Sequence, residues 1–253
     1  MTKDKQINNR PKGGVAAIAT FDLVATTLDQ LKNRRQGMDG IGCLYGPSGW
    51  GKTFSSNVLA LETRAYFVQI QPVWTKKTFL QKILDEMKVD WDKSCSVPDL
   101  FDMVNNQLAV SGRILILDEF NRAIERPALA QITRAIFDCT QSPILLVGEE
   151  KLPSELTKPA FKQLYRRIAA WAEAQDVTVQ DTAKLAPIYC PSIDFAEEAL
   201  SALTTFSKGS VSAVVKCLNV IHEDCLVTGK ENINLAALQK IALPSATHPK
   251  RKI

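Results

Sequence analysis

The sequence lacks a long hydrophobic run. No stretch approaches the ~20 consecutive apolar residues that a bilayer-spanning helix needs, although 45% of the chain is hydrophobic, as is ordinary for a globular protein. The first residues, MTKDKQINNRPKGG, are polar and contain no apolar segment of the kind found in signal peptides. We therefore expect a cytoplasmic protein with no membrane partner.

Metal-binding patterns are also missing. The chain has only two histidines, and none of its six cysteines stands in a C-x-x-C pair. Zinc sites usually need such pairs or several histidines. We expect the cysteines to be free thiols in a reducing compartment.

The chain lacks a large excess of charge of either sign, with 31 basic and 27 acidic residues. The net charge of +4 does not by itself indicate that the protein binds nucleic acid. The two ends are nevertheless basic. We expect a flexible arm over residues 1–14 and a basic tail over 244–253, which either are solvated or contact DNA or a partner. Their basic residues are Lys3, Lys5, Arg10 and Lys12 at the front and Lys250, Arg251 and Lys252 at the back.

Strand and helix patterns alternate through the first three quarters of the chain, which predicts a parallel sheet with helices on both faces. Apolar runs predict strands at 41–46, 65–71, 113–120 and 143–150, with a possible last strand at 183–190. Helical periodicity predicts helices at 21–36, 52–63, 76–88, 97–111, 127–140 and 159–175. After Pro191 only helical stretches are expected, at 193–207, 210–229 and 233–243. We therefore place an α/β domain at 15–191 and a small helical domain at 192–243.

The segment CLYGPSGWGKT fits the phosphate-loop pattern G-x-x-x-x-G-K-[ST] and stands between a predicted strand and a predicted helix. Glycines let the backbone N–H groups point at phosphate oxygens, and the positive end of the helix favours the anion. Lys52 is expected to reach the β- and γ-phosphates and Thr53 to bind Mg²⁺. The residues expected to line the nucleotide are Gly46, Pro47, Ser48, Gly49, Trp50, Gly51, Lys52, Thr53 and Phe54.

Two adjacent acids, Asp118 and Glu119, end the apolar run ILILD. A carboxylate at the carboxyl end of a strand lies beside the phosphate loop in this architecture. Asp118 is expected to help hold the nucleotide's Mg²⁺, and Glu119 to polarise the attacking water. The alternative is an exposed acidic turn after a core strand. With the loop, the pair favours ATP over GTP as the substrate.

These motifs resemble those of AAA+ ATPases over about residues 15–243. Within that superfamily, LYGPSGWGKT, LILDEFNR and PILLVGEEKL resemble the MuB/TnsC group, the ATPases that partner transposases of phage Mu-like and related elements. The resemblance implies an AAA+ P-loop domain, a five-stranded parallel sheet between helices, with a C-terminal helical lid. It also implies a bacterial or phage-infected host cytoplasm.

The family pattern implies an arginine finger that completes the site of a neighbouring subunit. In FKQLYRRI, Arg167 fits this role first and Arg166 second, and either would neutralise transition-state charge in trans. A basic helix face is the alternative. Gln71, after the second strand, is expected to restrain Glu119 until DNA binds.

Two positions depart from the family pattern. The fourth strand should end in Asn or Thr but ends in Gly148 and Glu149, and the lid carries Ser212 where an arginine is expected. Both changes remove contacts to the transition state. We therefore predict slow intrinsic hydrolysis.

The resemblance further implies an ATP-bound helical filament around double-stranded DNA, lined by the segment that follows the second strand. In QPVWTKKTF, the candidate phosphate contacts are Thr75, Lys76, Lys77 and Thr78, with Arg122 as a further candidate. An ordinary amphipathic helix start is the alternative. Such contacts read no sequence, so binding is expected to be non-specific and salt-sensitive.

The favoured function is thus a DNA-binding AAA+ ATPase, assembled as a homo-oligomeric ring or filament, that selects target DNA and activates a transposase. The phage Mu B protein has an N-terminal helix-turn-helix module for which this chain has too few residues ahead of its core, so we expect a shorter variant. The alternatives are another AAA+ role, as a replication-initiator-like loader or a secretion-associated ATPase, and an ATP-gated scaffold with negligible hydrolysis. No winged-helix or membrane module is visible, which disfavours the loader and the secretion-associated ATPase.

Overall fold

The computed structural model describes residue 14 and residues 16–244. The chain divides into two compact units. We call Leu23–Ser48 with Lys52–Ala174 the α/β unit, and Met1–Asp22, Gly49–Gly51 and Gln175–Ile253 the helical unit. The units thus separate after Ala174, whereas the sequence placed the boundary at 191/192. Apart from residue 14 and Pro244, the predicted arm and tail lie outside the described residues.

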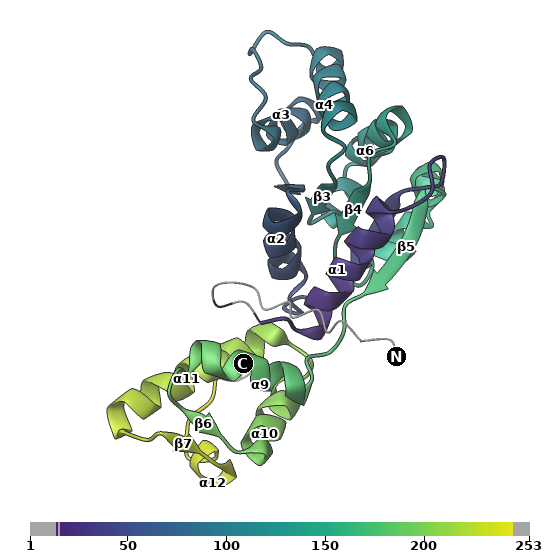
Figure 1. The fold of residues 1–253 in the computed structure, drawn as a ribbon. Helices are drawn as coiled ribbons and strands as arrows, with labels where there is room; N and C mark the ends of the chain where they lie inside the picture. The colour runs from purple at the N-terminus through teal and green to yellow at the C-terminus, as the bar shows by residue number, and fades with distance from the viewer. Residues whose placement is uncertain (1–13, 15, 245–253) are drawn as a thin grey trace, which may run out of the picture. The chain divides into compact units, whose positions relative to one another are not determined.

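The α/β unit is built on a five-stranded sheet in the order β2-β3-β4-β1-β5, and every neighbouring pair is parallel (Figure 1). The predicted fold class is therefore confirmed. The strands are β1 (Ile41–Tyr45), β2 (Tyr66–Gln69), β3 (Leu115–Asp118), β4 (Ile144–Val147) and β5 (Ile168–Glu173). All residues of the central strands β3 and β4 are buried, which explains their continuous apolar sequences.

One face of the sheet is covered by α3 (Lys76–Met87), α4 (Val97–Ser111) and α6 (Pro127–Thr140), with α4 packed against both others (Figure 1). Alternate strand residues, such as Leu115 and Leu117, enter this core beside Phe79 and Phe137 of the helices. The alternation follows from the pleat, which sends successive side chains to opposite faces.

The other face is approached by α1 (Ala19–Lys32) at Gly42 of β1. A Cβ atom at Gly42 would lie 2.8 Å from Leu31 Cδ1 and 3.2 Å from Leu145 Cδ1. This glycine therefore lets a helix approach the backbone of a central strand closely.

The helices of the α/β unit begin and end with recognisable caps. Thr75 caps α3, and its hydroxyl accepts a hydrogen bond from the N–H of Thr78 at 3.2 Å. Ser96 and Asp99 form a capping box at the start of α4, and Gly112 ends that helix in a left-handed conformation. The other helices are α2 (Lys52–Thr63), α5 (Asn121–Ile124), α7 (Leu152–Leu156) and α8 (Lys162–Tyr165), with a 3-10 turn at Pro159–Phe161.

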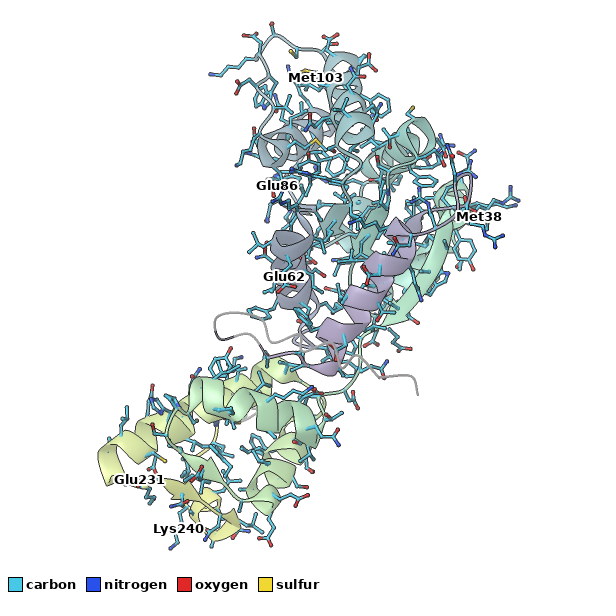
Figure 2. All side chains as sticks on the ribbon, in the orientation of Figure 1. Met38, Glu62, Glu86, Met103, Glu231 and Lys240 are labelled. Carbon is cyan, nitrogen blue, oxygen red and sulfur yellow. The ribbon has the colours of Figure 1, made fainter. Side chains whose placement is uncertain are left out.

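The edge strand β2 is partly protected by Glu86 of α3, which Figure 2 labels. Its carboxylate accepts a hydrogen bond from the N–H of Phe67 at 3.5 Å. An edge strand presents unpaired backbone groups, and a charged partner blocks their pairing with another strand.

Two predicted elements are wrong in type. The fifth strand is β5 (Ile168–Glu173), inside the predicted helix 159–175, and the predicted strand 183–190 lies in α9 (Val179–Tyr189). Helix α9 begins with a capping box in which Thr178 and Asp181 hydrogen-bond each other's backbone N–H groups. This T-x-x-D pattern indicated a helix start, but the apolar run that follows it resembles a strand.

The helical unit contains α9 and three further helices, α10 (Glu197–Ser207), α11 (Val211–Thr228) and α12 (Leu235–Leu238). It also contains two short parallel strands, β6 (Asp194–Phe195) and β7 (Asn232–Ile233), which the sequence did not predict. Over the described part of the chain, no helix is both long and apolar enough to span a membrane.

We predict that Gly42→Ala lowers the free energy of unfolding by ~1–3 kcal/mol, because the added methyl group overpacks against Leu31. Urea denaturation measures the effect. The double variant Gly42→Ala/Leu31→Val removes part of the clash, so the two substitutions should couple favourably in a double-mutant cycle. Simple additivity of the two effects would contradict the proposed close packing.

Candidate nucleotide-binding site

The predicted phosphate loop leaves β1 and enters α2, as the sequence predicted. Gly46 has φ +148°, and a Cβ there would lie 3.0 Å from the Cβ of Ala174. Gly51 has φ +83°, a conformation that glycine adopts without strain. The loop is thus shaped by backbone conformations that favour glycine.

Lys52 is only 9% exposed and begins α2. Its Nζ donates hydrogen bonds to the carbonyl oxygens of Gly46 and Pro47, both at 2.7 Å. Burial lowers the pKa of Lys52, and nearby carboxylates raise it in opposition. Those carboxylates are Asp118, Glu119, Glu149 and Glu150. One buried ammonium group therefore faces acids from the ends of two strands, β3 and β4.

Asp118, the last residue of β3, is 2% exposed. Burial raises its pKa. The carboxylate lies near the hydroxyl of Thr53, which favours the ionised form and so lowers the pKa of Asp118 in part, as does the backbone of Glu119. A hydroxyl and a carboxylate side by side at a phosphate loop are the oxygen donors that Mg²⁺ takes with a nucleotide. The chemistry of this pair fits the predicted metal site, which remains a prediction.

Gln69, at the end of β2, also contacts Asp118: its Nε2 donates to Oδ2 at 3.2 Å. The strands β2 and β3 are in register there, with Gln69 opposite Asp118. Gln71, which we expected to restrain Glu119, is exposed and lies beyond the strand, and its role stays a prediction. The contact of Gln69 with Asp118 depends on strand register, which a single sequence does not reveal.

Glu119 follows Asp118 in a left-handed backbone conformation, with φ +56°. Such a conformation costs a non-glycine residue ~1–2 kcal/mol. It turns the chain sharply between β3 and α5, and the Glu119 side chain remains 37% exposed. Its Oε2 lies 4.0 Å from Nε of Arg122. Glu119 is thus next to the nucleotide loop and accessible to water.

The two candidate finger arginines have different surroundings. Arg167 Nε donates to Asp138 Oδ1 at 2.8 Å, and its Nη1 lies 3.5 Å from Asp39 Oδ1. Arg166 is exposed and lines a surface pocket of about 500 Å³. Among the described residues none forms an ion pair or hydrogen bond with its side chain. Arg167 is thus paired within its own subunit, whereas Arg166 is available to contact another one; which of the two is the finger stays a prediction.

The predicted DNA contacts gather at the start of α3. Lys76 is exposed, and the hydroxyls of Thr75 and Thr78 lie 3.0 Å apart. Lys77 Nζ donates to the carbonyl oxygen of Lys93 at 2.9 Å. Arg122 is ion-paired with Glu119 and, at 3.6 Å, with Glu125. Four of the five candidates thus share one helix end, and Arg122 belongs to the acidic site.

Residues Gly49–Gly51 of the phosphate loop are part of the helical unit. The N–H of Ser212, at the start of α11, donates to the carbonyl oxygen of Gly49 at 3.0 Å. A Cβ at Gly209 would lie 3.0 Å from Cζ2 of Trp50. Phe54, the last predicted loop residue, is 53% exposed in α2. Where an arginine was expected, Ser212 thus contacts the loop through its backbone.

The comparisons with known proteins agree with this geometry. Residues 34–156 match a family model described as an AAA domain. The structure is similar to that of the Aeropyrum pernix ORC2 protein in its ADPNP-ADP complexes, with a TM-score of 0.68 and 15% identity, over 91% of this chain and 68% of that one. The protein has the AAA+ P-loop fold.

Two further proteins are similar to this chain. The Thermotoga maritima RuvB Holliday junction branch migration motor has a TM-score of 0.61 at 18% identity, over 88% of this chain and 68% of that one. General secretion pathway protein A of Aeromonas hydrophila is 25% identical over 207 residues, which cover 74% of this chain. The chain spans only 37% of the length of that relative.

Asp118→Asn should raise the melting temperature of the nucleotide-free protein at pH 7. Because burial raises its pKa, the carboxyl group stabilises the fold most below its unfolded-state pKa, and this contribution is lost as pH rises through the folded-state pKa. Removing the charge should stabilise by ~1 kcal/mol, or ~2–4 °C. Three other carboxylates still compensate Lys52.

Thermal denaturation across acidic and neutral pH measures this effect, and the difference from wild type should shrink as pH falls. Asp138→Asn is the control of opposite sign, since it breaks the ion pairs with Arg134 and Arg167. A lower melting temperature for Asp118→Asn at pH 7 would show that the ionised carboxylate stabilises the fold instead.

Proposed function

We propose that this protein is an ATPase that hydrolyses ATP to ADP and phosphate. The observation that carries the proposal is the meeting of Lys52, Thr53 and Asp118 at one end of the sheet, with Glu119 next in the chain. Lys52 binds the β- and γ-phosphates, Thr53 and Asp118 hold Mg²⁺, and Glu119 accepts a proton from water. When bound, the Mg²⁺ neutralises phosphate charge.

Turnover in the isolated subunit is slow. Glu149 brings a negative charge to the end of β4, where a neutral polar side chain would favour the γ-phosphate. Ser212 supplies no positive charge to the developing transition state. The scaffold alternative, with negligible hydrolysis, is the limit of this trend.

Assembly completes the site. Arg166, free of partners among the described residues, enters the nucleotide site of a second copy of this chain. The charge balance supports this arrangement, because each site gathers four carboxylates around one lysine and gains from an added cation. Nucleotide hydrolysis and oligomer assembly therefore depend on each other.

Arg166→Ala should lower ATP turnover at least ~100-fold at an unchanged melting temperature, because an arginine finger acts only on the transition state. Arg167→Ala should instead lower the melting temperature, because the loss of its ion pairs lowers the free energy of unfolding by ~1 kcal/mol. Mixing Arg166→Ala subunits with Lys52→Ala subunits should restore part of the activity, since mixed oligomers contain sites with both groups intact. Absence of any restoration would exclude a finger acting in trans.

The second part of the proposal is binding of double-stranded DNA without sequence preference. Support comes from the start of α3, where Lys76 is exposed and the first backbone N–H groups of the helix are available to a phosphate. The likeness of the fold to a Holliday junction branch migration motor is consistent with DNA as a partner. Arg122, held by two glutamates, is the weaker candidate; its pairing with Glu119 would instead let DNA affect the catalytic acid.

Lys76→Ala/Lys77→Ala should weaken DNA binding equally for all sequences. If both side chains contact phosphates, the slope of log K against log salt concentration should become less steep by about 1.8, or ~0.9 for each contact. The double variant Lys82→Ala/Lys230→Ala removes the same charge elsewhere and should keep the wild-type slope. Equal slopes for all three proteins would move the DNA site away from α3.

The most specific part of the proposal is a role in DNA transposition: the ATP-bound protein forms helical filaments on target DNA and recruits and activates a transposase. It is supported by the resemblance of LYGPSGWGKT, LILDEFNR and PILLVGEEKL to the MuB/TnsC group. The second candidate, an ATPase of a secretion system, is favoured by the 25% identity to general secretion pathway protein A.

Electron microscopy with a slowly hydrolysed ATP analogue separates the two candidates. Nucleotide-dependent filaments on duplexes of unrelated sequence, together with a rise in ATP turnover when a transposase of a Mu-like element is added, would support transposition. Closed rings formed without DNA, with turnover insensitive to DNA and transposase, would support the secretion role and exclude the favoured one.

A further inference from the structure

We propose that Ser212 is a positioning residue for the nucleotide, because its backbone N–H holds one peptide group of the phosphate loop in the orientation that binds phosphate. The inference rests on the proposed binding of ATP. Ser212 is the second residue of α11, and its N–H donates to the carbonyl oxygen of Gly49 at 3.0 Å. Both residues belong to the helical unit.

The peptide group that joins Gly49 to Trp50 is not fixed by its own residues. Gly49 has φ +83°, and glycine adopts positive and negative values of φ with similar ease. Gly51, on the other side of Trp50, has the same φ. A peptide group among such residues can turn over, which exchanges the directions of its C=O and its N–H. A contact from outside the loop is therefore needed to select one orientation.

The hydrogen bond from Ser212 selects that orientation. No peptide bond of the described chain is cis, and in a planar trans peptide group the C=O and the N–H point in opposite directions. The carbonyl oxygen of Gly49 points to Ser212, so the N–H of Trp50 points away from α11. Backbone N–H groups of a phosphate loop cradle the phosphates of the nucleotide. If the peptide group turned over, a carbonyl oxygen would replace this N–H and repel the phosphates.

Ser210, the N-cap residue of α11, supports the same contact. Its Oγ donates to the carbonyl oxygen of Gly49 at 3.4 Å and accepts a hydrogen bond from the N–H of Ala213 at 3.2 Å. A Cβ atom at Gly49 would lie 2.8 Å from this Oγ and 2.9 Å from the Oγ of Ser212. The start of α11 thus approaches the loop more closely than a side chain at Gly49 would permit.

The ring of Trp50 attaches the loop to the turn between α10 and α11. A Cβ atom at Gly209 in this turn would lie 3.0 Å from Trp50 Cζ2 and 2.6 Å from Asp176 Oδ1. The N–H of Val177 donates to the carbonyl oxygen of Gly209 at 3.2 Å, which holds the turn in place. The hydrogen bond to Gly49 and the ring of Trp50 therefore fix two adjacent residues of the loop to one support.

This role differs from the one expected of an arginine at the same position. An arginine side chain would contact the transition state, whereas the loop N–H groups bind the α- and β-phosphates. ATP and ADP share those phosphates. The contact from Ser212 should therefore strengthen the binding of both nucleotides equally, and it should depend on the main chain rather than on the hydroxyl group.

The test compares Ser212→Pro with Ser212→Ala in the full chain, by the Kd for fluorescent analogues of ATP and of ADP. Proline is tolerated in the first turn of a helix but has no N–H, whereas alanine removes only the hydroxyl group. We expect Ser212→Pro to raise both Kd values ~10–100-fold, as when a hydrogen bond to a charged group is lost. Ser212→Ala should change either Kd less than about twofold.

Glu198→Pro is the matched control, because Glu198 is the second residue of α10 in the same unit and is exposed. The N–H groups of a first helical turn have no partner within the helix, so this proline removes no contact to the loop. Both Kd values should stay within about twofold of wild type.

The wild-type protein tests the same contact without a substitution. By linkage, a hydrogen bond that strengthens ADP binding is itself strengthened by ADP. In NMR spectra of protein labelled with ¹⁵N-serine, ADP should slow hydrogen exchange of the Ser212 amide at least ~10-fold. This measurement decides the question if Ser212→Pro does not fold.

Unchanged Kd values in Ser212→Pro, a weaker Kd for ATP alone, an equal loss in Ser212→Ala, or amide exchange that ADP does not alter would each overturn the role of Ser212. The proposed ATPase function fails separately. A wild-type protein that shows the expected binding but never hydrolyses ATP, with DNA and transposase present, would overturn that function and leave the role of Ser212 intact. A wild-type protein that binds neither nucleotide would overturn both.

Discussion

Lys52 and Asp118 are two buried groups of opposite charge beside the phosphate loop. The need to compensate both charges is the constraint on which the rest of the α/β unit depends. Each is almost inaccessible to water, and an isolated buried charge is costly. Lys52 is compensated by loop carbonyls and carboxylates, and Asp118 by Thr53, Gln69 and the backbone. A parallel sheet satisfies both requirements, because the carboxyl ends of its strands lie along one edge.

The same edge carries more negative charge than one lysine balances. Glu119, Glu149 and Glu150 add to Asp118 around Lys52. In the proposed function, such a site gains from added cations, from Mg²⁺ with the nucleotide and from Arg166 of a second copy of the chain. The proposed slow turnover of the isolated subunit and the proposed dependence on assembly would then both result from this charge distribution.

Sequence patterns were reliable where one physical cause dominates. The phosphate loop and the acid pair have fixed spacing, and the buried strands β1, β3 and β4 are continuous apolar runs, so their positions were predicted. The segment that forms β5 is rich in helix formers, and its place beside β1 overrides that preference. The segment that forms α9 was predicted as a strand because its apolar run is short, although the capping box at Thr178 indicated the start of a helix.

The sequence by itself determined the nucleotide loop, the acidic strand end and the alternation that builds a parallel sheet, because these follow from local spacing and periodicity. Only the tertiary structure shows that Gln69 contacts Asp118, and that Arg167 is ion-paired with Asp138 while Arg166 has no side-chain partner among the described residues. These outcomes depend on strand register and on contacts between residues far apart in the chain, which local patterns do not encode.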